Sequence, residues 1–345
     1  MGEGSGFPET AGALLERLGS LYGLVDELEP ARRVAQRLRP VLLETSVSLR
    51  PGTQTDLRLT LGIPPRPDDP QGRSALLAAL SGLGAGRVSA PVDAALAHVA
   101  GAPREGELAR SLALRARSGE PVQPRPGARV GGRTGAERFA RAADAMRSVG
   151  LERAAAVQER IAAEFRGNPF NAVIPYGLGF DLRPDRALGA KTYLSCEWPD
   201  VAVGFMRGRL ADELGLKGVE VFELLAAIAR ADWRRERWLL EVSFELPADP
   251  ARGVRAKAYV STRRLASSEA EAHKLVLRIA AGLGIDLRPY EELVEAVRPD
   301  GLTPERPCSL RAGVSASSLG PSLEVYLFDP ARFASTAAPA ATRGS

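Results

Sequence analysis

Two hydrophobic periods alternate along the chain. Leucine and alanine recur at i, i+3 and i+4 in several stretches, which is the spacing of one face of a helix. These predicted helices cover roughly 10–38, 73–82, 91–116, 134–166, 201–231, 267–284 and 289–297. Other stretches alternate apolar and polar residues on both sides of a glycine or proline turn, which predicts β-hairpins. The predicted hairpins cover 41–63, 172–196, 237–262 and 308–328.

Each predicted strand has one apolar face and one polar face. Val242, Phe244 and Leu246 point one way, while the residues between them point the other, because side chains alternate along a strand. Antiparallel hairpins joined by helices can lie in one sheet whose apolar face the helices cover, which is an α+β fold. If that sheet were flat, its polar face would meet water; if it closed, the face would become a polar lumen.

The composition is that of an ordinary globular protein. The chain has 345 residues, 45% hydrophobic and 26% charged, enough for one large domain or two small ones. We expect a single domain over 11–333. Residues 1–10 and 334–345 are rich in small and polar residues and are expected to be disordered. The stretch near 118–135 combines proline, glycine and arginine without periodicity, so it is expected to be a loop or an insertion.

Composition also argues against several classes of protein. No apolar run reaches the length of a membrane span, and the first residues carry no signal-peptide pattern. Two cysteines and two histidines, without ligand spacing, predict neither a disulfide framework nor a zinc site. A cytoplasmic location is therefore expected. The net charge of +4 suits an anionic ligand.

The strongest single signal is a tripeptide that recurs in the second strand of successive predicted hairpins. It reads Lys191-Thr192-Tyr193, then Lys257-Ala258-Tyr259, then Glu324-Val325-Tyr326, and its tyrosines are evenly spaced along the chain. Even spacing indicates a repeated unit of helices plus hairpin. One such tripeptide alone is typical of a solvated strand. Its recurrence is what favours a functional interpretation.

A cation and a phenol two residues apart lie on the same face of a strand, and Arg255 joins that face in the middle repeat. Lysine and arginine can hold a diphosphate through charge-assisted hydrogen bonds. Aromatic faces stabilise a carbocation and keep water away from it. An allylic diphosphate that ionises needs all of these together.

These motifs resemble the aromatic prenyltransferases of the tryptophan dimethylallyltransferase family. The family's Arg-x-Lys-x-Tyr is matched by Arg255, Lys257 and Tyr259, and its preceding Lys-x-Tyr is matched at 191–193, after Phe-Asp-Leu at 180–182. The first hairpin, with Leu-Glu-Thr-Ser at 43–46 and an arginine at 58, is also similar. The resemblance implies the ABBA fold, an antiparallel barrel with a polar lumen surrounded by helices. Only four hairpins are predicted, so a fifth repeat would be missing or degenerate.

The resemblance also implies roles for individual residues. Glu44 would hold or deprotonate the acceptor ring. The diphosphate would be bound by Arg58, Lys191, Arg255 and Lys257. The allylic cation would be shielded by Tyr193, Tyr259 and Tyr326. Glu324 departs from the family pattern, which has a neutral or basic residue at this position.

The implied donor is dimethylallyl diphosphate or a longer allylic diphosphate, and the implied acceptor is an indole, with phenols and peptide side chains also open. No cofactor or metal is expected, because lysine and arginine can neutralise the diphosphate and no paired Asp-rich motif occurs. Asp68-Asp69 stands in a proline loop and is typical of a turn.

A second hypothesis is a non-catalytic protein that binds a peptide or partner on the same scaffold. A closed barrel with all four cations facing inward would favour the enzyme, whereas an open sheet or an apolar lumen would favour the binder. Nucleic-acid binding is not expected, because acidic residues interrupt the basic stretch at 233–238.

Overall fold

The computed structural model describes most of the chain. The described residues are 10–38, 41–49, 56–63, 67–100, 110–166, 173–196, 199–220, 223, 240–260, 268–298, 301–302, 310–317 and 322–328. The two ends predicted to be disordered, apart from Thr10, and the basic stretch at 233–238 lie outside these residues.

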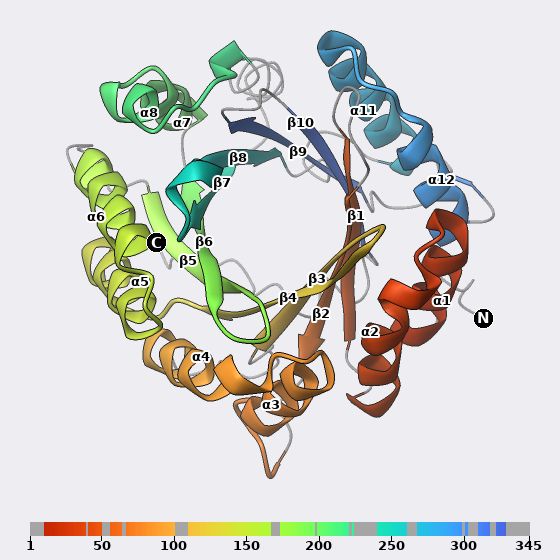
Figure 1. Cartoon of the computed structure of the whole chain (residues 1–345). Helices are drawn as coiled ribbons and strands as arrows, with labels where there is room; N and C mark the ends of the chain where they lie inside the picture. The colour runs from red at the N-terminus through yellow and green to blue at the C-terminus, as the bar shows by residue number, and fades with distance from the viewer. Residues whose placement is uncertain are drawn as a thin grey trace, which may run out of the picture.

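The strands come in five consecutive pairs. They are β1 (Val41–Leu49), β2 (Asp56–Ile63), β3 (Arg110–Arg117), β4 (Glu120–Arg129), β5 (Val173–Leu182), β6 (Ala187–Cys196), β7 (Leu240–Pro247), β8 (Arg255–Val260), β9 (Leu310–Ser317) and β10 (Ser322–Phe328). All neighbours are antiparallel, and pairing of β1 with β10 closes the barrel. The expected antiparallel barrel is therefore confirmed (Figure 1).

Helices surround the barrel on the outside, as predicted (Figure 1). They are α1 (Ala11–Tyr22), α2 (Val25–Leu38), α3 (Arg73–Gly82), α4 (Gly86–Val99), α5 (Gly135–Ser148), α6 (Glu152–Arg166), α7 (Pro199–Met206), α8 (Arg209–Glu213), α11 (Glu269–Leu283) and α12 (Arg288–Val297). The predicted helix 10–38 is divided in two, because Gly23 ends α1 in the left-handed conformation with φ of 63°.

The fifth hairpin is present, as β3 and β4. The predicted helix 91–116 was wrong at its end, since α4 ends at Val99 and 110–117 is a strand with alternating burial, while 101–109 lie outside the described residues. The loop or insertion predicted near 118–135 was also wrong, because a short turn at 118–119 is followed directly by β4. The repeat is degenerate only in sequence: Arg125-Pro126-Gly127 replaces Lys-x-Tyr.

Prolines made β4 difficult to predict from sequence. Proline lacks the N–H that a central strand needs. However, β4 pairs with β5 only from Gly127 to Arg129, whereas Pro124 and Pro126 lie opposite β3 alone. These two prolines therefore occupy a part of the strand that has a partner on one side only.

The hydrophobic core lies between the barrel and the helices. Val242, Phe244 and Leu246 of β7 are buried there, and the Phe244 ring meets the Phe205 ring of α7 edge to face at 5.1 Å. Burial of one such side chain contributes about 1.5–3 kcal/mol. Because these side chains point outward, the alternate residues of every strand point into the lumen.

Asp69 has the structural role expected for it. Its carboxylate accepts hydrogen bonds from the backbone N–H groups of Arg73 (2.7 Å) and Ala75 (3.1 Å), at the start of α3. Within the described residues, no helix is long and apolar enough to cross a membrane.

Candidate active site in the barrel lumen

The second strand of each hairpin has a charged side chain at one equivalent lumen position, at nearly equal intervals along the sequence. We call these residues the lumen ring: Arg58, Arg125, Lys191, Lys257 and Glu324. All members are cations except Glu324, which is a carboxylate. Arg125 was missed in the sequence, although counting back from Lys191 by the interval between Lys191 and Lys257 leads to it.

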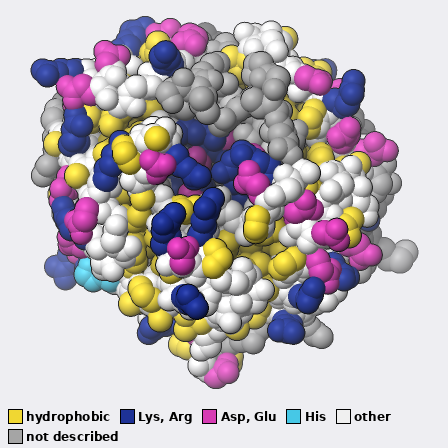
Figure 2. All heavy atoms as spheres, in the orientation of Figure 1, with side chains coloured by type: hydrophobic (Ala, Val, Ile, Leu, Met, Phe, Trp, Pro, Cys, Tyr) yellow, Lys and Arg dark blue, Asp and Glu magenta, His cyan; other side chains and the backbone are white. Residues whose placement is uncertain are grey.

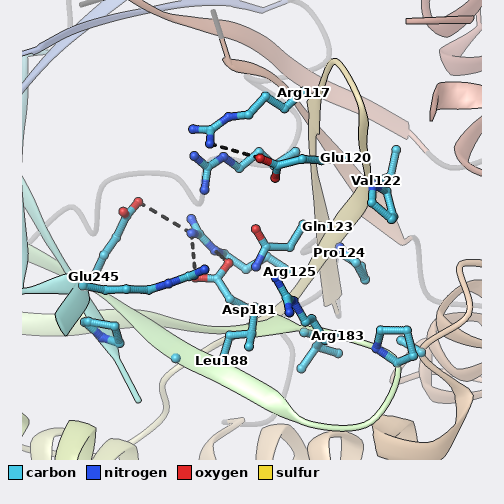
Figure 3. Close-up of a pocket in the computed structure, with 18 of the residues that line it drawn as sticks. Arg117, Glu120, Val122, Gln123, Pro124, Arg125, Asp181, Arg183, Leu188 and Glu245 are labelled. Carbon is cyan, nitrogen blue, oxygen red and sulfur yellow. Dashed lines mark hydrogen bonds and ion pairs between the residues drawn. The ribbon is translucent and has the colours of Figure 1, made fainter. Parts of the chain in front are cut away.

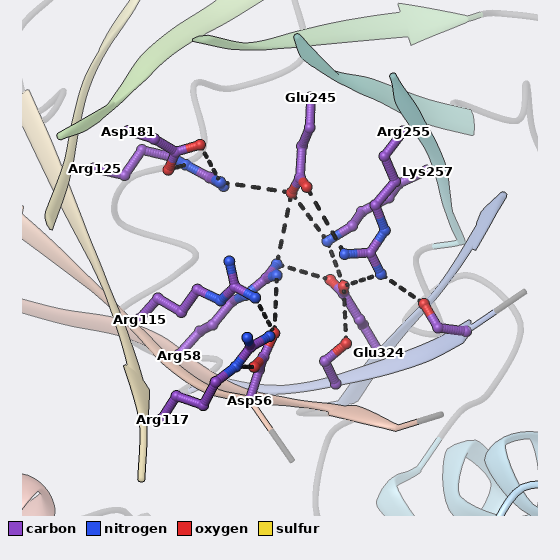
Figure 4. A network of polar contacts seen from close by, with 12 residues as sticks. Asp56, Arg58, Arg115, Arg117, Arg125, Asp181, Glu245, Arg255, Lys257 and Glu324 are labelled. Atoms are coloured by element: carbon purple, nitrogen blue, oxygen red, sulfur yellow. Dashed lines mark hydrogen bonds and ion pairs between the residues drawn. The ribbon is translucent and has the colours of Figure 1, made fainter. Parts of the chain in front are cut away.

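Glu245 of β7 joins the cations of the ring (Figure 4). Its carboxylate lies 3.4 Å from Lys257 Nζ, 3.6 Å from Arg125 and 3.7 Å from Lys191 Nζ. Arg255 and Arg58 lie 3.8 and 3.9 Å away. The structure therefore brings the four predicted diphosphate-binding residues around one point. Burial would raise the pKa of Glu245, but Lys257, Arg125, Arg255 and Lys191 outweigh it and hold that pKa well below its usual value.

Glu324 is the second carboxylate of this network and is enclosed more completely. It accepts hydrogen bonds from Arg255 at 3.1 Å, Arg58 at 3.3 Å and the Ser48 hydroxyl at 3.3 Å. Lys257 forms an ion pair with Glu324, and the Glu324 side chain is 1% exposed. Burial opposes its ionisation, yet Arg58, Lys257 and Arg255 keep its pKa well below the usual range.

The lysines lose basicity at this position. Burial is the main cause, and it lowers the pKa of Lys191 to about 7 despite the opposing effect of Glu245. Burial, together with the neighbouring Arg255 and Arg58, lowers the pKa of Lys257 well below its usual value. The two carboxylates therefore do not fully offset the burial and the crowding of the lysines.

Several polar atoms of the site lack a hydrogen bond. Among the described residues, Arg58 Nε is buried without a hydrogen-bond partner, and Lys257 Nζ and Glu245 Oε1 are buried in ion pairs that lack hydrogen-bond geometry. Such atoms are uncommon in folded proteins and carry a desolvation cost. An anion placed in the ring would supply acceptors for the two nitrogen atoms.

The tyrosines lie next to the ring. Tyr193 follows Lys191 on the same face of β6, and the Nζ atom of Lys191 lies 4.8 Å from the centre of its phenol ring. Tyr176 lies beside Tyr193 at 6.0 Å. Tyr326 is buried and donates a hydrogen bond of 2.6 Å to Glu324. The backbone of Tyr259 in β8 pairs with β7, but its side chain lies outside the described residues.

Glu44 occupies the same part of the lumen as the tyrosines. It is half-buried on β1 and accepts a hydrogen bond of 3.1 Å from the Thr60 hydroxyl of β2. Burial is the main cause of the raised pKa of Tyr193, and the charge of Glu44 contributes to it. Glu44 therefore lies within electrostatic reach of Tyr193, across the lumen from it.

Glycines on β5 make room for two of these side chains. A Cβ atom at Gly177 would come within 3.1 Å of the Tyr193 ring, and one at Gly179 within 3.2 Å of the Arg125 side chain. Both distances are tighter than ordinary packing. The glycines of β5 therefore leave room for the side chains of Tyr193 and Arg125.

A cavity of about 820 Å³ lies where the hairpin turns of β3–β4, β5–β6 and β7–β8 meet. Figure 2 shows lysine and arginine side chains gathered around this hollow. The cavity reaches the network through Arg125 and Glu245 (Figure 3). Arg255 of the network also lines it. It adjoins the part of β4 that lacks β5 as a partner.

Three arginines at this end of the barrel that were not predicted from the sequence are paired with aspartates. Arg125 binds Asp181 through two hydrogen bonds of 2.6 and 2.9 Å. Arg115 and Arg117 bind Asp56 at 2.6 and 2.5 Å. Among the described residues, no cluster of three or more His, Cys, Asp or Glu side chains could hold a metal ion.

Comparison with known proteins gives matches in structure alone. No protein-family profile matches the sequence, and no curated protein matches it. The 6-dimethylallyltryptophan synthase from Micromonospora olivasterospora, solved with DMASPP and Trp, has a TM-score of 0.70 at 18% identity, covering 93% of this chain and 96% of that one. The 5-dimethylallyltryptophan synthase from Streptomyces coelicolor has a TM-score of 0.66 at 19% identity, and the match covers 93% of this chain and 97% of that one.

A third structure with a similar fold comes from another organism. AnaPT from Neosartorya fischeri has a TM-score of 0.61 at 17% identity and covers 93% of this chain and 92% of that one. All three matches span nearly the whole length of both partners. The closed barrel, its surrounding helices and these matches together show that the chain has the ABBA fold of the tryptophan dimethylallyltransferases.

Proposed function

We propose that the protein is an aromatic prenyltransferase that moves a dimethylallyl or longer allylic group from its diphosphate to an electron-rich aromatic acceptor, with an indole as the first candidate. The observation that carries the proposal is the convergence of Arg58, Lys191, Arg255 and Lys257 in a closed lumen. Two of these side chains bear buried nitrogen atoms without hydrogen bonds. A diphosphate would supply the missing acceptors.

The reaction follows from this arrangement. The C–O bond of the donor breaks, and its electron pair leaves with the diphosphate, whose charge the cations neutralise. The phenol faces of Tyr193 and Tyr326 stabilise the allylic cation and exclude water. A ring carbon of the acceptor then forms the new C–C bond.

Glu44 serves the acceptor. As charge develops on the ring, its carboxylate holds a ring N–H or O–H and raises the electron density of the ring. The proton lost when aromaticity returns passes to a base, and Glu44 lies on the lumen side where it can take this role. We propose that the lysines and arginines replace a divalent metal in holding the diphosphate.

The test is incubation of the protein with labelled dimethylallyl diphosphate and a panel of indoles and phenols. The enzyme hypothesis expects a prenylated product from at least one acceptor. Binding of the donor without a product from any acceptor would instead favour the non-catalytic binding protein. The closed barrel and inward cations support the enzyme.

A further inference from the structure

One member of the lumen ring has the wrong charge for a diphosphate site. Glu324 follows Lys257 at the repeat interval and occupies in β10 the position that the other four hairpins fill with a cation. Its carboxylate contacts Arg58, Arg255 and Lys257 (Figure 4). These are three of the four cations assigned to the diphosphate.

The Glu324 carboxylate lies where a bound anion would contact the same cations. A phosphoryl oxygen that contacted the same three cations would have to lie where Glu324 lies now. Buried cations without enough counter-ions would destabilise the folded protein, so Glu324 makes the empty ring tolerable. Arg58 Nε is still buried without a hydrogen bond in this state, so the internal carboxylate satisfies the ring only in part.

The surroundings of Glu324 also provide an alternative to the cations. The hydroxyl groups of Ser48 and Tyr326 donate hydrogen bonds to it at 3.3 and 2.6 Å. Both hydroxyls are neutral and neither was assigned to the diphosphate. They can keep the carboxylate hydrogen-bonded after the cations have turned to a ligand.

We propose that Glu324 is an internal substitute for the donor diphosphate: it occupies the cations in the empty enzyme, yields them when the donor binds, and returns to them when the product diphosphate leaves. The proposal rests on the proposed function and deepens it. In this role, Glu324 lowers the affinity of the site for diphosphate and thereby speeds release of the product diphosphate. Nothing in the sequence of reaction steps requires it to touch the acceptor.

The experiment measures binding of inorganic pyrophosphate by calorimetry to the full chain and to Glu324→Gln. Removing the competing charge should tighten binding by about tenfold or more, the effect of one charge-assisted contact. The matched control is Glu152→Gln, which removes one negative charge from an exposed position on α6 and should leave affinity unchanged. Product inhibition by pyrophosphate should strengthen in parallel.

A structure of the unaltered protein with pyrophosphate provides a second test that does not depend on a variant's folding. The account expects pyrophosphate to contact Lys257 and Arg255, with Glu324 withdrawn onto Ser48 and Tyr326. Pyrophosphate bound while Glu324 keeps its cations, or unchanged affinity in Glu324→Gln, would overturn this inference and leave the proposed donor site standing. If the unaltered protein does not bind pyrophosphate, the proposed function fails as well.

Discussion

Lys257 and Glu324 form an ion pair in which each side chain is only 1% exposed. They lie on β8 and β10, with β9 between them. A buried pair of this kind is weak evidence for stability, because desolvation offsets much of the attraction. Here Lys257 also contacts Glu245, and burial lowers its pKa well below the usual value. Under the proposed function, these contacts prepare the site for a more highly charged ligand, the diphosphate.

The first prediction concerns Lys257. Lys257→Ala removes one charge-assisted contact, worth roughly 1.5–3 kcal/mol, so affinity for an allylic diphosphate should fall by about tenfold or more. Calorimetry with a non-reactive thiolodiphosphate analogue measures this directly. Lys217→Ala, which changes an exposed lysine, should bind as the parent does. Equal affinity in both variants would reject the site.

The second prediction concerns pH. The pKa of Lys191 in the empty protein is about 7, below its unfolded value, so at pH 8 most molecules carry a neutral amine there. A bound diphosphate favours the ammonium form and raises that pKa. Binding at pH 8 should therefore take up protons, and affinity should fall as pH rises above about 7.

Proton uptake can be measured by calorimetry in buffers of different ionisation enthalpy. Lys191→Gln has no titrating group at this position, so its uptake should be smaller by up to about one proton per diphosphate bound. The comparison cancels titration of the diphosphate itself. The same uptake in both proteins would show that Lys191 does not change its protonation on binding.

The sequence predicted most of the fold because one pattern served two purposes. The alternation in segments such as 241–246 marks both the buried outer face and the polar lumen, and four of the five hairpins follow from it. The hairpin β3–β4 was missed because Pro124 and Pro126 suggested a loop. The arrangement of the whole barrel determines which parts of a strand lack a partner. A local sequence pattern therefore cannot show that prolines are tolerated in β4.

The candidate site was predicted in part for a related reason. Spacing located the residues that repeat, so Lys191, Lys257 and Glu324 were found. Glu245 was not, because it lies on a first strand and outside the tripeptide. Its importance comes from cations on several other strands, and such convergence depends on how the barrel closes.

The third prediction concerns Glu44. Glu44→Gln should lower turnover by about 10²–10⁴-fold, the usual range for a lost general base, while affinity for diphosphate stays nearly the same. The matched comparison is Glu241→Gln, because Glu241 also faces the lumen and accepts a hydrogen bond of 2.7 Å from Tyr176. If only Glu241→Gln lost turnover, Glu241 rather than Glu44 would be the general base.

The fourth prediction concerns the shield around the allylic cation. Tyr193→Ala removes a ring beside Lys191 and admits water, so part of the donor should end as prenyl alcohol. Tyr193→Phe keeps the ring face and should form little alcohol. Chromatography of both products gives the ratio. An unchanged ratio in Tyr193→Ala would show that this ring does not protect the cation.

The fifth prediction concerns metal. The lysines and arginines of the lumen can neutralise a diphosphate without a divalent ion, so transfer should continue in EDTA. Turnover would be measured before and after chelation, and again after addition of Mg²⁺. Complete loss followed by rescue with Mg²⁺ would mean that the cations alone do not hold the donor.

The central claim is that transfer proceeds through the cations of the lumen, and a single-turnover measurement tests it most directly. Labelled dimethylallyl diphosphate and the best acceptor would be mixed with the parent protein and with a Lys191→Met, Lys257→Met double variant. We predict that the parent forms the prenylated acceptor and that the double variant, if folded by circular dichroism, forms almost none. Parent-level product from the folded double variant would contradict the account.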